Sequence, residues 1–157
     1  QRVLVFLNPE RDPGALYNLH QALISIGSGG LWGQGYGVGS QSQLHFLRVR
    51  HTDFIFSVIG EELGFMGAMM LFFMFILLAW RLLRAAVLAP DRFGRLVVVG
   101  VGAMIFVPLL INVGMNLGLL PVTGLPLPFV SYGGTALVTY MTALGLVESV
   151  AMRHRER

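Results

Sequence analysis

The sequence predicts an all-α polytopic membrane protein, in which three transmembrane helices follow a large extracytoplasmic loop that carries one short amphipathic helix. Hydrophobic residues make up 55% of the 157 residues and charged residues 12%, with a mean hydropathy of +0.70. That composition is too apolar for a soluble domain of this length. The expected regions are an extracytoplasmic loop over 1–53, a three-helix transmembrane region over 54–152 and a cytoplasmic tail over 153–157.

The charged residues narrow the class further. All eleven basic residues are arginine, and a net charge of +3 is too small and too scattered to indicate a nucleic-acid partner. The chain has no cysteine, which excludes a disulfide or a thiolate metal site. It opens on Gln1 and shows no targeting segment, so we expect a fragment of a longer polytopic chain.

The first predicted helix lies in the extracytoplasmic loop. Asp12 before Pro13 is a helix start signal, and Gly27 is the expected stop. Between them, apolar residues recur at helical spacing, at Leu16, Leu19, Leu23 and Ile26. The helix is too short to span a bilayer, so it is expected on the membrane surface or on the outer face of the protein.

A glycine-rich segment follows, with seven glycines among residues 27–40. It has neither the G-K-[ST] ending nor the G-x-G-x-x-G spacing of a phosphate-binding loop. We therefore expect an irregular loop in which glycine permits close approach of backbones, with Trp32 and Tyr36 at the membrane interface, rather than a nucleotide site.

Three long apolar runs are expected to cross the membrane. The first, Phe54 to Trp80, contains only two charged residues, Glu61 and Glu62, and as one helix would be roughly 40 Å long. The second and third cover 96–119 and about 133–152. Arginines cluster between the first two runs and at the end of the chain, so the positive-inside rule makes both segments cytoplasmic and the 1–53 loop extracytoplasmic. The clustered residues are Arg81, Arg84, Arg92, Arg95, Arg153, Arg155 and Arg157.

Polar residues in the second run have two interpretations. Pro108, Asn112 and Asn116 follow at four-residue steps and share one helix face. Either the helix is kinked and its asparagines bond neighbouring helices, or the same face lines a polar cavity. After this run, three prolines and three glycines over 120–135 predict a loop at or below the outer membrane surface, around Ser131 and Tyr132.

Asp53 is the acid that this topology places at the outer membrane boundary, beside the first apolar run. It could be a general base, or it could only cap the following helix. Glu61 would lie roughly 12 Å deeper on the same helix, facing the interior, and Glu62 on the opposite side. A stripe of small residues on that helix predicts a close packing seam, at Ser57, Gly60, Gly64 and Gly67.

Two arginines precede Asp53 on the outer side. Arg48 and Arg50 either bind an anionic group such as a diphosphate or are simply solvated. The histidines lack metal-ligand spacing and are interpreted as polar loop residues, at His20, His45 and His51. The candidate substrate-binding residues are therefore Arg48, Arg50, Glu61, Ser131 and Tyr132, while no metal ligand is identified.

Several long motifs, in one order along most of the chain, resemble the SEDS family (shape, elongation, division and sporulation), the RodA and FtsW proteins. They read GSQSQL at 39–44, HTDFIF at 51–56, GEELGF at 60–65 and LPVTGLPLPFVSYGG at 120–134. Shorter matches are YN at 17–18 and IGSGG at 26–30. The first run favours the RodA, elongation-type branch. Two departures are the LRVR sequence at 47–50, where many relatives carry Leu-Pro-Glu, and Thr135 in place of a common serine.

The resemblance implies a peptidoglycan glycosyltransferase of about ten membrane helices, of which this chain would hold the last three. Such an enzyme polymerises lipid II at the outer face of the plasma membrane together with a class B penicillin-binding protein. The family's essential catalytic aspartate falls on Asp53. The alternatives are a flippase or transporter of a lipid-linked precursor, and a non-catalytic membrane scaffold for a cell-wall synthase.

The implied chemistry needs a base near the membrane surface and positive charge at the departing diphosphate. Asp53 would supply the base, and Arg48 or Arg50 the charge. A divalent cation, Mg²⁺ or Mn²⁺, is the other possible source of charge, although the sequence itself does not show one.

Overall fold

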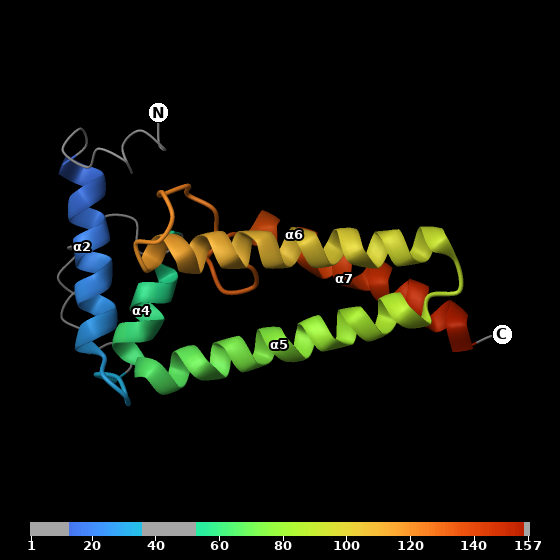
Figure 1. The fold of residues 1–157 in the computed structure, drawn as a ribbon, viewed down its shortest axis with the longest axis horizontal. Coiled ribbons are helices and arrows are strands. Elements are labelled where there is room, and N and C mark those ends of the chain that lie inside the picture. Colours follow the sequence, from blue (N-terminus) through green and yellow to red (C-terminus); the bar gives the residue numbers. More distant parts are fainter. Residues whose placement is uncertain (1–12, 36–52, 156–157) are drawn as a thin grey trace.

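The computed structural model of the chain describes residues 13–35 and 53–155, and the regular structure in these ranges is helical. Three long helices, α5 (Gly64–Leu88), α6 (Arg92–Asn116) and α7 (Gly134–Arg155), run lengthwise, as Figure 1 shows. Two shorter helices, α2 (Pro13–Ser28) and α4 (Ile55–Glu62), lie across one end of them. The architecture confirms the all-α class. Helices α5, α6 and α7 form the lengthwise bundle, and α2 and α4 form the transverse end.

Helix α2 confirms the predicted amphipathic helix, but it presents a different face to the protein. It begins at Pro13 as expected and ends at Ser28, one residue after the predicted stop. Ala22 and Ser25 are fully buried, whereas Leu23 of the predicted apolar stripe is 41% exposed. Small side chains face inward because α2 packs closely against α4.

The first predicted span, a single helix over Phe54–Trp80, is wrong. The chain forms α4 and then breaks at Leu63 and Gly64, where Gly64 takes a left-handed φ of 65°. Helix α5 starts anew from Gly64 and continues to Leu88, beyond the predicted end. Glu61 and Glu62 therefore belong to the transverse α4 and not to the lengthwise helix that is apolar enough to cross a membrane.

The glycine-rich segment after α2 stabilises this break. The carbonyls of Gly30 and Leu31 accept the backbone N–H groups of Phe65 and Met66, in the first turn of α5. Gln34 and Gly35 in turn donate their backbone N–H groups to the carbonyls of Glu61 and Glu62, in the last turn of α4. The first N–H groups and the last carbonyl groups of a helix have no partner within that helix. Here one loop bonds the last carbonyls of α4 and the first N–H groups of α5. Side chains would prevent it, since a Cβ at Gly33 would overlap the carbonyl of Glu62. The expected close backbone approach is confirmed for residues 27–35.

The second and third predicted spans are confirmed with shifted ends. Helix α6 contains Pro108 in its interior and ends at Asn116, and α7 runs on to Arg155. Residues 117–133 between them form no helix, as the prolines predicted. The lengthwise helices share one buried apolar cluster, which includes Phe75, Leu82, Val98, Ile105, Tyr140 and Val147.

Many large apolar side chains of the long helices are exposed, among them Phe73, Ile76, Leu96, Leu110 and Val138. In the most apolar stretch of α5 only 17% of the residues are buried, and the same share holds for α7. Helices α5, α6 and α7 are each long and apolar enough to cross a membrane, so the described part of the chain has three candidate spans, as predicted.

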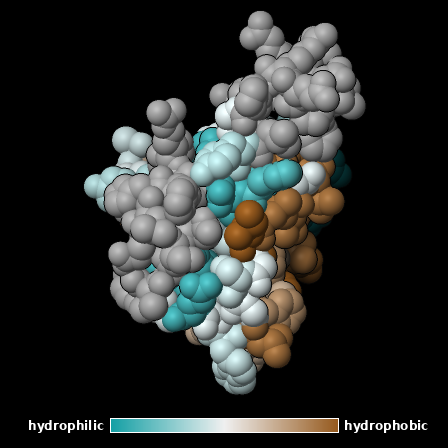
Figure 2. Space-filling view, turned by 90° about the vertical axis from the view of Figure 1, so that its left-hand side faces the viewer, coloured by the Kyte–Doolittle hydropathy of each residue, from teal (hydrophilic) through white to brown (hydrophobic). Residues whose placement is uncertain are grey.

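The two ends of the lengthwise bundle differ. The α5–α6 connection and the last turns of α7 lie together at one end (Figure 1). This connection consists of Ala89–Asp91 only. The arginines Arg81, Arg84, Arg92 and Arg95 therefore lie within the flanking helices and not in the connection itself. Helices α2 and α4 lie at the opposite end, and Figure 2 shows hydrophilic residues at the centre of that face and hydrophobic ones along one side.

Candidate active site

Asp53 lies where the transverse part meets α6 and the 117–133 loop. It is half-buried and stands one residue before Phe54, the N-cap of α4. Phe54 is buried against Ala22 of α2 and Val122 of the loop. The interpretation of Asp53 as a helix cap is wrong, because the helix starts one residue later and no side chain caps it by a hydrogen bond.

The asparagines of α6 reach the backbone of Asp53. The amide nitrogens of Asn112 and Asn116 both donate to the Asp53 carbonyl oxygen, at 3.1 Å and 3.0 Å. Both asparagines are fully buried, and Asn112 also donates to the carbonyl of Leu125 at 2.7 Å. The bond from Ser57 of α4 to Asn116 agrees with the first interpretation, in which the asparagines bond neighbouring helices, whereas the amide N–H groups bond Asp53 ahead of α4, the loop and α6 itself. Sequence reasoning had found the two residues but not their connection to Asp53.

The predicted small-residue stripe serves three separate purposes. Gly60 packs α4 against Ile26 of α2, which confirms a packing seam there. Ser57 is fully buried and donates its hydroxyl to Oδ1 of Asn116 at 2.6 Å. Gly64 forms the helix break, and a Cβ at Gly67 would contact Leu63. The four residues do not form one packing seam, because the single helix predicted to carry them is two helices, α4 and α5.

Glu61 faces the interior, as predicted. Its side chain is 0% exposed and interacts with other groups of the protein. Glu62 is half-buried beside it on α4. Both residues belong to the transverse α4, which begins two positions after Asp53.

The loop candidates differ in accessibility. The Ser131 hydroxyl oxygen accepts the backbone N–H of Leu127 at 2.7 Å, which holds a turn within the loop. Tyr132 is 85% exposed and is available to a ligand. Arg48 and Arg50 lie outside the described residues, as do His45, His51 and Tyr36.

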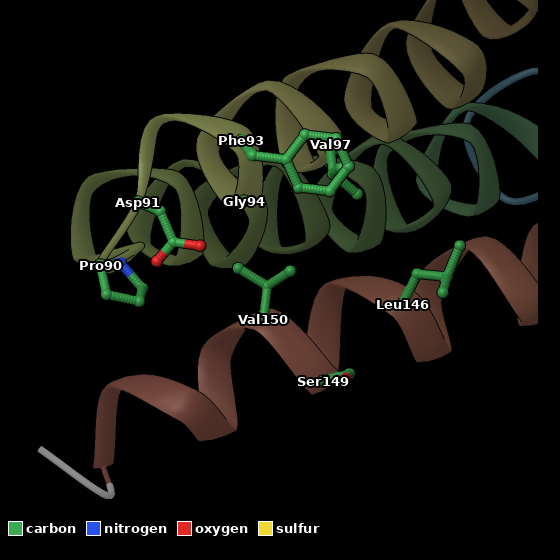
Figure 3. Close-up of a pocket in the computed structure, with 8 residues that line it drawn as sticks. All are labelled: Pro90, Asp91, Phe93, Gly94, Val97, Leu146, Ser149 and Val150. Atoms are coloured by element: carbon green, nitrogen blue, oxygen red, sulfur yellow. The ribbon is translucent and has the colours of Figure 1, made fainter.

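The other candidate positions carry little chemistry. Within residues 13–35 and 53–155, no three acidic or histidine side chains are grouped to hold a metal ion. A hollow of about 270 Å³ lies at the far end of the bundle, between the start of α6 and α7 (Figure 3). Its lining is mainly apolar, with Asp91 and Ser149 as polar members.

Comparison with known proteins decides the family. Residues 1–156 match the FtsW/RodA/SpoVE family of cell cycle proteins. The chain belongs to this family. Membership in the FtsW/RodA/SpoVE family confirms the resemblance that the motifs predicted, and it covers the transverse end as well as the three candidate spans.

Individual members of the FtsW/RodA/SpoVE family match nearly the whole of this chain. The chain is 51% identical over 151 residues to the peptidoglycan glycosyltransferase MrdB of Escherichia coli, covering 96% of this chain and 41% of the relative. It is 42% identical to the stage V sporulation protein E of Bacillus subtilis, covering 99% and 42% of the two chains. Identity to the peptidoglycan glycosyltransferase RodA of Treponema pallidum is 43%, covering 97% and 35%.

A solved structure shares the fold. It is described as "Structural coordination of polymerization and crosslinking by a peptidoglycan synthase complex", and one of its chains aligns with a TM-score of 0.76 and 34% identity. The alignment covers 99% of this chain and 42% of that chain. The chain thus spans about two fifths of the length of the proteins it matches.

Proposed function

We propose that the full-length protein is a peptidoglycan glycosyltransferase that polymerises lipid II into glycan strands for cell elongation and shape. The observation that carries the proposal is the position of Asp53, a half-buried carboxylate at the transverse end whose backbone two buried asparagines hold. The 51% identity to a protein named as a peptidoglycan glycosyltransferase supports it.

In this proposal Asp53 acts as the general base. It takes the proton from the 4-hydroxyl of the GlcNAc of one lipid-linked sugar, whose oxygen attacks the anomeric carbon of MurNAc on another. The bond from that carbon to the undecaprenyl diphosphate breaks, and the electron pair stays on the departing diphosphate. A single displacement of this kind inverts the anomeric centre.

Positive charge stabilises the departing diphosphate. Arg48 and Arg50 precede Asp53 in the chain and are proposed for this role, with Tyr132 as an exposed contact for the substrate. A divalent cation, Mg²⁺ or Mn²⁺, is a further proposal. Asp53 would be one ligand beside the substrate phosphates, because its half-buried position leaves it partly accessible and Mg²⁺ is commonly held by one or two carboxylates together with substrate phosphates.

The membrane arrangement is part of the same proposal. The protein lies in the plasma membrane as a multi-pass protein, with the transverse end extracytoplasmic and the arginine-rich end cytoplasmic. The sequence supports this orientation, because one arginine cluster flanks the α5–α6 connection and the other follows at the end of the chain, and the last turns of α7 lie at the same end of the bundle as that connection (Figure 1). The likeness to a chain of a peptidoglycan synthase complex supports a class B penicillin-binding protein as the partner. The elongation branch rests on the sequence motif at 39–44, since identities of 43% to a RodA and 42% to an FtsW do not separate the branches.

The Asp53→Asn variant tests the function. Asparagine cannot take the proton, and loss of a general base lowers the rate by about 10²- to 10⁴-fold. Stability should stay unchanged, because no capping bond of the Asp53 side chain is lost. We expect the full-length variant to insert and bind its partner normally but to leave labelled lipid II unpolymerised. Normal polymerisation would remove Asp53 from the mechanism.

The same variant separates the alternatives. A scaffold would be indifferent to Asp53→Asn, and a flippase would still move lipid. The structure gives the transport alternative no support at the face of Asn112 and Asn116, because their amides are engaged with backbone carbonyls.

A further inference from the structure

The carbonyl of Asp53 has no partner in its own helix. Helix α4 takes Phe54 as its N-cap, and the Phe54 carbonyl accepts the first helical N–H groups, from Ser57 and Val58. The carbonyl of Asp53 lies one residue earlier, out of reach of that ladder. At this part-buried position the carbonyl needs a partner from elsewhere. Asn112 and Asn116 provide it from α6, which lies 59 and 63 residues away in the sequence.

The asparagine amides are fully used in this arrangement. The two N–H bonds of Asn112 point at the carbonyls of Asp53 and Leu125, at 3.1 Å and 2.7 Å. The amide nitrogen of Asn116 lies 3.0 Å from the Asp53 carbonyl and 2.8 Å from the carbonyl of Asn112. Each primary amide has two such hydrogens, and Asn112 Oδ1, 3.2 Å from the Asn116 amide nitrogen, is a further acceptor, so every donor of the two amides has an acceptor within reach. The network has no unused donor for a ligand, and its function lies in holding other groups.

Ser57 completes the network from α4. Its hydroxyl donates to Oδ1 of Asn116 at 2.6 Å, which fixes the orientation of that amide and points its nitrogen at Asp53. All three side chains are 0% exposed. Hydrogen bonds at such depth gain strength from the low local dielectric. Hydrogen bonds among Ser57, Asn112 and Asn116 thus hold the Asp53 peptide between α4, α6 and the 117–133 loop. These three side chains are called the clamp.

We propose that Asn112 and Asn116 are positioning residues that aim the Asp53 carboxylate, and that Ser57 holds Asn116 in place. This inference rests on the function proposed for Asp53. Fixing the carbonyl fixes the peptide plane, and with it the direction in which the Asp53 side chain leaves the backbone. Because Asn112 also holds Leu125, the same clamp sets the distance between Asp53 and the loop.

Alanine variants of the full-length protein with its partner test the clamp. Displacement of a reacting group by about 1 Å can lower the rate by about 10²-fold. We expect Asn112→Ala and Asn116→Ala to lower kcat for lipid II polymerisation by about 10- to 100-fold per folded molecule, with KM nearly unchanged. Ser57→Ala should have a smaller effect in the same direction, since Asn116 keeps its own bond to Asp53.

Matched controls separate the clamp from general loss of a polar side chain. Asn18→Ala removes an asparagine from α2, and Thr139→Val removes a hydroxyl that bonds only within α7, to the carbonyl of Thr135 at 2.8 Å. Both controls should leave kcat unchanged. Unchanged kcat in folded Asn112→Ala and Asn116→Ala, beside an inactive Asp53→Asn, would overturn the inference while leaving the proposed function intact.

A double-mutant cycle distinguishes positioning from structural support. In an Asp53→Glu background the carboxylate is already displaced by one methylene, so Asn116→Ala should cost a much smaller factor in kcat than it does beside Asp53. A purely structural residue would cost the same factor in both backgrounds, which would contradict the inference. Should Asn116→Ala fold poorly, Asn116→Ser keeps a polar group that is too short to reach Asp53, and the same cycle applies. An active Asp53→Asn would instead refute the role of Asp53, and the positioning role would fall with it.

Discussion

Gly29 and Gly60 meet backbone to backbone between α2 and α4, and a Cβ on Gly29 would overlap the carbonyl oxygen of Gly60. On the other side of the contact, a Cβ on Gly60 would lie 3.2 Å from the side chain of Ile26. The two helices pack this closely because both residues lack side chains. The position of α4, and of Asp53 before it, therefore depends on glycine at this crossing.

Gly29→Ala should destabilise the transverse end. Its new methyl group meets rigid backbone, and overpacking of this kind costs about 1–3 kcal/mol. Gly27→Ala is the matched control, because nothing lies within 4 Å of its added Cβ and alanine favours helix by up to about 1 kcal/mol. Thermal unfolding in detergent should show a lower Tm for the first variant and an equal or higher Tm for the second. Equal Tm values for both variants would show that the α2–α4 contact is looser than described.

Gly64→Ala should weaken the break between α4 and α5. Its φ of 65° strains any residue with a Cβ, and the added carbon would also press on the backbone of Gly33. We expect a loss of about 1–3 kcal/mol in the free energy of unfolding. Gly100→Ala on α6 has open space around it and serves as the control. A variant that unfolds like the control would favour a continuous helix through residue 64.

Ser131 and Tyr132 should separate stability from substrate binding. Ser131→Ala leaves the part-buried N–H of Leu127 without its acceptor, which costs about 1–3 kcal/mol. Tyr132→Ala removes an exposed side chain and should leave Tm unchanged while raising KM for lipid II. Polymerisation kinetics beside unfolding curves measure both effects. If Tyr132→Ala changes neither Tm nor KM, the substrate contact assigned to Tyr132 is wrong.

Single cysteines should report the orientation in the full-length protein, with any cysteine outside these 157 residues replaced, since the 157 residues contain none. Trp32 beside the transverse end and Phe93 at the arginine-rich end are 80% and 75% exposed. Trp32→Cys should react with an impermeant maleimide in intact cells, and Phe93→Cys only after the cells are opened. The reverse labelling pattern would invert the proposed topology.

Sequence patterns predicted the elements better than their junctions. Hydropathy located the second and third candidate spans and most of the first, and proline located the 117–133 loop, because apolar side chains and prolines act where they stand in the chain. The break at Gly64 was missed, since the apolar run continues across it and glycine at one position does not reveal its φ. The groups that stabilise the break come from residues 30–35, more than 25 positions earlier, and no local pattern encodes such a partner.

In the candidate site, too, local patterns found the residues but not the contacts between them. Asp53 was found through a motif, and Asn112 and Asn116 through their spacing. That the asparagines hold the Asp53 carbonyl depends on how α6 packs beside α4, which is a tertiary relationship. The alternative of a helix cap at Asp53 was wrong by a single residue, because α4 takes Phe54 as its N-cap.

The break at Gly64 also separates the position of Asp53 from the dimensions of the bilayer. In one continuous helix, each residue inserted between Asp53 and the arginine-rich end would shift the carboxylate by about 1.5 Å and rotate it by about 100°. With α4 turned aside and clamped to α6, the length and tilt of α5 can adjust to thinner or thicker lipid while Asp53 keeps its place beside α6. Hydrophobic mismatch is then absorbed by a helix that does not carry the carboxylate.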